Sequence, residues 1–88
     1  MAKVFVALGD EHRQRIMLTF EKGERLTVGR ISEVSTLSRP AVSHHLKILR
    51  AADILESEKI GKEVHLRINK EMLEETLANV LDYVRESA

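Results

Sequence analysis

The chain has 88 residues, 43% of them hydrophobic and 32% charged, which is typical of one folded domain and not of a disordered chain. Its 14 basic residues balance 14 acidic ones, and the absence of cysteine excludes disulfides, thiolate metal ligands and cysteine nucleophiles. The apolar run from Val4 to Leu8 is far shorter than a membrane span, so we expect a cytoplasmic protein with no membrane partner.

A first helix is predicted to follow Asp10 and to run to about Lys22. The Asp10 carboxylate can accept hydrogen bonds from the free N–H groups of a helix start. Gly23 then supplies a stop signal, because glycine readily adopts the left-handed conformation found at helix ends.

Two further helices follow with a turn between them. Thr27 can cap a short helix over residues 28–34, and residues 35–37 lack apolar periodicity and are expected to form the turn. Ser38 can cap the next helix, with Pro40 in its first turn, where a missing backbone N–H is tolerated. This order of elements predicts a helix-turn-helix.

The third of these helices has one apolar and one polar face. Val42, Leu46 and Leu49 follow one another at the spacing of a single buried stripe. His45 lies beside that stripe and is expected to pack. The polar face opposite the stripe carries Arg39, Ser43, His44, Lys47 and Arg50.

Alternation replaces helical periodicity after Asp53. Val64, Leu66 and Ile68 are spaced by two, and the Gly61-Lys62 pair supplies a turn, which predicts a two-stranded β-hairpin. A last helix is predicted after Asn69, with an apolar stripe over about three turns. The stripe contains Met72, Leu73, Leu77, Val80, Leu81 and Val84.

Charge is sorted along the chain although its sum is zero. Residues 34–52 contain three basic side chains and no acidic one. Residues 71–88 instead hold five acidic side chains against a single basic one, Arg85. This asymmetry favours a protein in which one face meets phosphate while another is kept away from it.

The segment from Leu37 to Arg50, with Ser-His-His-Leu-Lys at residues 43–47, resembles the recognition helix of the ArsR-type winged-helix repressors of bacteria and archaea. Upstream, residues 7–10 together with Arg13 and Arg15 resemble the first-helix pattern of the same family. The resemblance covers nearly the whole chain. It implies a mainly helical winged helix-turn-helix, one domain over residues 1–88, that dimerises and represses transcription at an imperfect palindrome.

The chain departs from the family pattern at three places. Glu11-His12 stands where the family usually has Pro-Thr, and Asp53 stands where it tends to have glycine. Metal sensors of the family use cysteines of the helix-turn-helix or Asp and His of the last helix, and this chain has no cysteine and no histidine after His65. We therefore expect no metal and no cofactor, and the effector, if one exists, is left open.

Candidate DNA contacts follow from the docking geometry that the resemblance implies. Arg39, at the start of the recognition helix, can bond guanine O6 and N7 bidentately or touch only phosphate. Ser38 combines capping with phosphate contact, and Lys62 lies at the tip of the wing. The predicted DNA-binding set is Ser38, Arg39, Ser43, His44, Lys47, Arg50 and Lys62.

Other polar residues have plainer interpretations. His44 and His45 are adjacent in a helix and point about 100° apart, so the pair is a poor metal site. His12 and His65 are isolated and are expected to be surface or satisfied polar groups, with a site shared between two subunits left open. Arg13 and Arg15 are expected to be solvated, the alternative being contact with the DNA backbone.

The apolar stripe of the last helix needs a covering surface. A second subunit is the expected cover, because few elements remain at the chain end, although packing within the chain would account for part of the stripe. The predicted dimer interface contains Val4, Phe5, Leu8, Leu73, Leu77, Val80, Leu81 and Val84.

These observations predict a homodimeric repressor of double-stranded DNA. The neutral net charge also permits a winged-helix module that binds another protein and not DNA. An enzyme is disfavoured, because no carboxylate pair, glycine-rich phosphate loop or nucleophile-base arrangement occurs at a usable spacing.

Overall fold

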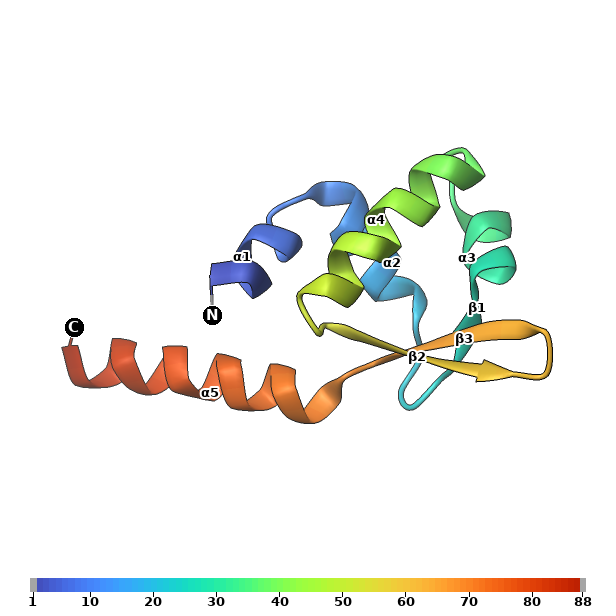
Figure 1. Cartoon of the computed structure of the whole chain (residues 1–88). Helices are drawn as coiled ribbons and strands as arrows, with labels where there is room; N and C mark the ends of the chain where they lie inside the picture. Colours follow the sequence, from blue (N-terminus) through green and yellow to red (C-terminus); the bar gives the residue numbers. More distant parts are fainter. Residues whose placement is uncertain (1, 88) are drawn as a thin grey trace.

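The computed structural model describes residues 2–87, as five helices and one three-stranded antiparallel sheet (Figure 1). The helices are α1 (Ala2–Leu8), α2 (Glu11–Thr19), α3 (Val28–Val34), α4 (Arg39–Ala51) and α5 (Lys70–Ser87). The strands are β1 (Leu26–Thr27), β2 (Leu55–Ile60) and β3 (Glu63–Ile68), with β3 in the middle. The predicted order of helix, helix-turn-helix, hairpin and helix is confirmed.

Four helices begin at the caps expected from the sequence. In each case a side-chain oxygen accepts a hydrogen bond from the backbone N–H three residues later, which satisfies a group that the helix itself leaves unpaired. These caps are Asp10, Thr27, Ser38 and Asn69.

The core lies where α4 crosses α1, α2 and α3 above the sheet. Val42, Leu46 and Leu49 of α4 are buried as predicted. They meet Ile31 of α3 and Leu66 of β3 in one apolar cluster. Burying a side chain of this size contributes about 1.5–3 kcal/mol, so this cluster fixes how α4 is oriented.

The first long helix ends earlier than predicted. α2 stops at Thr19 and not near Lys22, because Phe20 adopts an extended backbone and turns its side chain into the core. Gly23 does have a positive φ of 72°, but it serves the turn between α2 and β1. The apolar run before Asp10 forms a separate helix, α1, which the sequence analysis did not predict.

The hairpin prediction is correct but incomplete. β2 and β3 pair from Leu55 opposite Ile68 to Ile60 opposite Glu63, and Gly61, with a φ of 62°, opens the two-residue turn. A two-residue strand, β1, adds to the other edge of β3, with Leu26 opposite Leu66. The sheet therefore has three strands and not two.

Asp53 adopts the left-handed conformation considered for it, with a φ of 60°. Its carbonyl oxygen accepts a hydrogen bond of 3.1 Å from the Asn69 side chain. This bond ties the end of α4 to the start of α5, although Asp carries a steric penalty that glycine would avoid at this φ.

α5 leaves the helical body as an arm that points away from the hairpin turn (Figure 1). Met72 and Leu73, near its start, pack against the core, and α5 has no fully buried residue. Between residues 2 and 87, no helix combines the length and apolarity needed to cross a membrane.

Candidate nucleic-acid interface

The polar face of α4 lies in solvent as its spacing predicted. Ser38 is used as the N-cap, since its hydroxyl accepts a hydrogen bond of 3.3 Å from the backbone N–H of Ala41. The predicted contact residues of α4 are all exposed: Arg39, Ser43, His44, Lys47 and Arg50. Their exposure is confirmed, and their contact with DNA stays a prediction.

An open groove of about 1020 Å³ separates α4 from the hairpin. Ser43, Lys47 and Arg50 line its helical wall, while Ser57 lies on the sheet side. The guanidinium of Arg50 donates a hydrogen bond of 3.0 Å to the hydroxyl of Ser57, so α4 and the wing are joined directly. The groove also holds Asp53, Glu56 and Glu58, so its positive charge is concentrated on the helical wall, at Lys47 and Arg50. Side chains of this kind can bind a phosphate backbone.

Two acidic residues of the wing, both on β2, are paired with arginines within the sheet or at its edge. Glu56 pairs with Arg67, directly opposite on β3, at 3.0 Å. Glu58 pairs with Arg25, just before β1, at 3.3 Å. Neither ion pair was predicted from the sequence; strand register could have indicated the pairing of Arg67, but no local signal points to Arg25.

Lys62 lies at the tip of the hairpin and is exposed. The positive φ of Gly61 makes the turn tight, so Lys62 projects from the far end of the wing. Exposed basic side chains therefore lie at two separate places, the polar face of α4 and the tip of the wing.

Arg13 is not solvated, contrary to the prediction. Its Nε donates to the carbonyl oxygen of Ala7 at 2.6 Å, and its Nη2 donates to that of Val6 at 3.3 Å. These carbonyls belong to the last turn of α1, where a helix leaves its carbonyl groups without intrahelical partners, and that of Val6 also accepts a hydrogen bond of 3.2 Å from the backbone N–H of Gly9. Gln14 similarly donates to the carbonyl of Leu8 at 2.6 Å, so α2 caps the end of α1.

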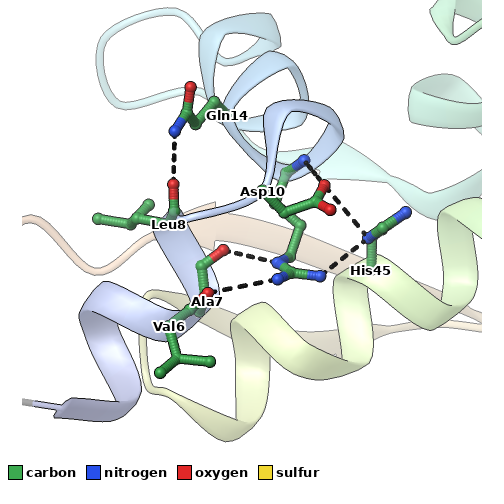
Figure 2. Close-up of polar contacts among 7 residues, drawn as sticks. Val6, Ala7, Leu8, Asp10, Gln14 and His45 are labelled. Atoms are coloured by element: carbon green, nitrogen blue, oxygen red, sulfur yellow. Dashed lines mark hydrogen bonds and ion pairs between the residues drawn. The ribbon is translucent and has the colours of Figure 1, made fainter.

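His45 packs beside the apolar stripe as expected, with 13% of its side chain exposed. Its Nδ1 lies 3.2 Å from Nη1 of Arg13 and 3.9 Å from Oδ1 of Asp10 (Figure 2). Burial lowers the pKa of His45 below its usual value, and Asp10 opposes this effect. The hydrogen bond from the backbone N–H of Arg13 lowers the pKa of Asp10.

The histidine rings gather without forming a metal site. The rings of His12 and His44 lie 5.7 and 5.6 Å from that of His45. Across residues 2–87, no three His, Asp or Glu side chains are arranged to hold a metal ion.

The residues predicted for a dimer interface divide into two groups. Val4 is only 5% exposed and lies in the core of its own chain, and Leu8 packs against that core, so neither is the open surface expected. Phe5, by contrast, is exposed. On α5, three residues are about half exposed: Leu77, Leu81 and Val84. Leu73 and Val80 are partly buried.

A helix-turn-helix whose second helix has an exposed basic face, followed by a hairpin with a lysine at its tip, defines the winged helix-turn-helix class of DNA-binding proteins. Comparison with known proteins agrees with this class. The model of the bacterial regulatory proteins of the arsR family matches residues 10–57.

Two relatives and one solved structure extend the similarity to most of the chain. The transcriptional repressor SdpR of Bacillus subtilis is 31% identical over 86 residues, covering 98% of this chain and 94% of the relative. The transcriptional repressor SmtB homolog of Synechocystis is 31% identical over 87 residues, covering 99% and 65%. An ArsR-like transcriptional regulator from Rhodococcus superposes with a TM-score of 0.87 at 29% identity, covering 97% and 77%.

The chain belongs to the arsR family, and it is a DNA-binding transcriptional regulator. The family, the winged helix-turn-helix fold and this function are the ones that the sequence predicted.

Proposed function

We propose that this regulator is a homodimeric repressor that inserts two α4 helices into successive major grooves of an operator. The observation that carries the proposal is the exposed basic face of α4, which lies beside the groove toward the wing. In such an arrangement α4 contacts base edges, while the wing and the helix N-terminus contact phosphates. Blocking of transcription follows from occupancy of the operator.

The proposed dimer is held by the α5 stripe, defined as Leu73, Leu77, Val80, Leu81 and Val84, together with Phe5 of α1. The stripe would be an unusual surface for a monomer, because Leu77, Leu81 and Val84 are each about half exposed along one helix face. A second copy covers them most simply by a symmetric contact. Recognition helices about 34 Å apart then match one turn of DNA.

The distribution of charge supports this orientation. α5, which contains five acidic residues, extends away from the hairpin turn (Figure 1). An operator bound along α4 and the wing avoids them. The cytoplasm is the compartment in which this proposed repressor meets chromosomal DNA.

Selection of bound duplexes from a random pool tests the proposal. We expect one enriched sequence with two related half-sites, whose spacing reports the separation of the α4 helices. Binding to it should weaken steeply with salt, because each neutralised phosphate releases counterions. Affinity weaker than about 10⁻⁴ M for every duplex, with no salt dependence, would instead favour a protein-binding module.

A further inference from the structure

The guanidinium of Arg13, on α2, makes contacts with both α1 and the recognition helix α4. Arg13, on α2, donates to the carbonyls of Val6 and Ala7 at the end of α1, at 3.3 and 2.6 Å. The same group contacts His45, in the middle of α4, at 3.2 Å. Arg13 therefore adds a polar link between α4 and α1 to the contacts that the two helices make in the apolar core.

The contact between Arg13 and His45 requires a particular protonation state. A guanidinium has five N–H donors and no acceptor, so Nδ1 of His45 must accept. The Arg13–His45 bond exists only while Nδ1 carries no proton. A proton on Nδ1 would set two donors and two positive charges against each other at 3.2 Å.

Asp10 is a second potential partner of His45, in addition to Arg13. Asp10 Oδ1 lies 3.9 Å from the same Nδ1 of His45. It already accepts a hydrogen bond of 3.1 Å from the backbone N–H of Arg13 as the N-cap of α2. Protonated His45 would therefore turn toward Asp10, which both releases Arg13 and competes with the cap of α2.

The charged and titratable groups around His45 come from two elements. Asp10, His12 and Arg13 face it from the start of α2, and His44 precedes it on α4. α1 contributes only the carbonyls that Arg13 binds. Burial, helped by Arg13 and the two other histidines, lowers the pKa of His45, while Asp10 raises it. His45 is therefore neutral at neutral pH.

We propose that Arg13 and His45 form a proton-sensitive joint that holds the recognition helix in its DNA-binding position, so that operator affinity falls when His45 takes up a proton. The inference rests on the DNA-binding function. His45 lies between His44 and Lys47, two residues predicted to face DNA, so a movement of its backbone moves that face. Arg13 and His45 are positioning residues, since neither is predicted to touch DNA.

The test compares the wild-type protein with His45→Asn on the selected duplex, from about pH 8 to about pH 5, a range that extends below the usual pKa of histidine because burial lowers the pKa of His45. The amide oxygen of Asn can replace Nδ1 as the acceptor, but it does not titrate. We expect equal affinities at the upper pH. At the lower pH the wild type should bind about fivefold more weakly than His45→Asn.

The ratio of the two affinities removes unrelated effects of pH. His12 and His44 are present in both proteins, so their own contributions are compared on an equal footing. His45→Leu lacks an acceptor and should bind weakly at every pH.

Separate outcomes identify which idea fails. A wild-type protein that binds no duplex at about pH 8 refutes the function itself, and the joint with it. Parallel pH profiles for wild type and His45→Asn, with binding intact, overturn the joint alone. Nuclear magnetic resonance of the His45 ring gives an independent answer: a proton on Nδ1 at neutral pH also overturns it.

Discussion

Replacing Leu81 by glutamate should separate the proposed dimer into folded monomers. Leu81 is 47% exposed in the single chain, and it lies on the arm beyond the residues of α5 that pack on the core. Full burial of a leucine contributes about 1.5–3 kcal/mol, so covering the exposed half contributes about 1 kcal/mol per subunit and about 2 kcal/mol per dimer. The substitution forfeits this contribution and adds two unpaired charges to an apolar contact.

An unpaired charge in a buried contact costs several kcal/mol, so the total loss is about 4 kcal/mol or more. This corresponds to a dimer dissociation constant that is about a thousandfold higher. Sedimentation equilibrium over a range of concentrations measures it, and far-ultraviolet circular dichroism checks that the monomer stays folded.

Asn79→Glu is the matched control, because it adds the same charge to the opposite, exposed face of α5 and should leave the dimer intact. A Leu81→Glu protein that dimerises as tightly as the wild type would refute the assignment of the α5 stripe to the interface. Equal weakening by both substitutions would refute it as well, because the effect would then reflect net charge and not contact.

Three further predictions concern single side chains. Arg39→Ala should relax base preference at one position of each half-site in a selection experiment, whereas Lys47→Ala should weaken binding to all duplexes and lower the salt slope by about 1. If Arg39→Ala weakens all sequences evenly, Arg39 touches only phosphate. Leu49→Ala should lower the free energy of unfolding by about 3 kcal/mol in urea, because Leu49 is fully buried; a change under about 1 kcal/mol would contradict the packing. Asp53→Gly should raise the free energy of unfolding by about 1 kcal/mol, because glycine avoids the steric strain of a φ of 60°. A lower free energy of unfolding would show that the Asp53 side chain stabilises the fold by more than this strain destabilises it.

Local signals predicted most of the fold. The caps at Thr27, Ser38 and Asn69 and the stripe of α4 depend on residues a few positions apart, so they can be recognised in the sequence and recur in the structure. The predicted end of α2 was wrong because Phe20 continues the apolar pattern of the helix but has an extended backbone and packs its side chain in the core. Tertiary packing overrode the helical pattern there.

Contacts between distant segments could not be predicted in this way. Arg13 finds its acceptors on α1 and α4, the second of them 32 residues away, and nothing near Arg13 in the sequence marks them. β1 has only two residues, too few for an alternation pattern, and exists because β3 offers it an edge. Arg25 and Glu58 are also far apart in the sequence, so no local pattern predicts that they form an ion pair.

Spatial pairing also explains how a chain with no net charge presents a basic surface. Two glutamates of the wing, Glu56 and Glu58, are each held by an arginine within the sheet, so they add little negative potential to the groove beside α4. α5, which contains five acidic residues, extends away from the hairpin turn (Figure 1). Among residues 2–87, none of the ion pairs formed involves Arg39, Lys47 or Lys62. A basic surface for phosphate therefore depends on where charges are neutralised, which the sum over the sequence does not reveal.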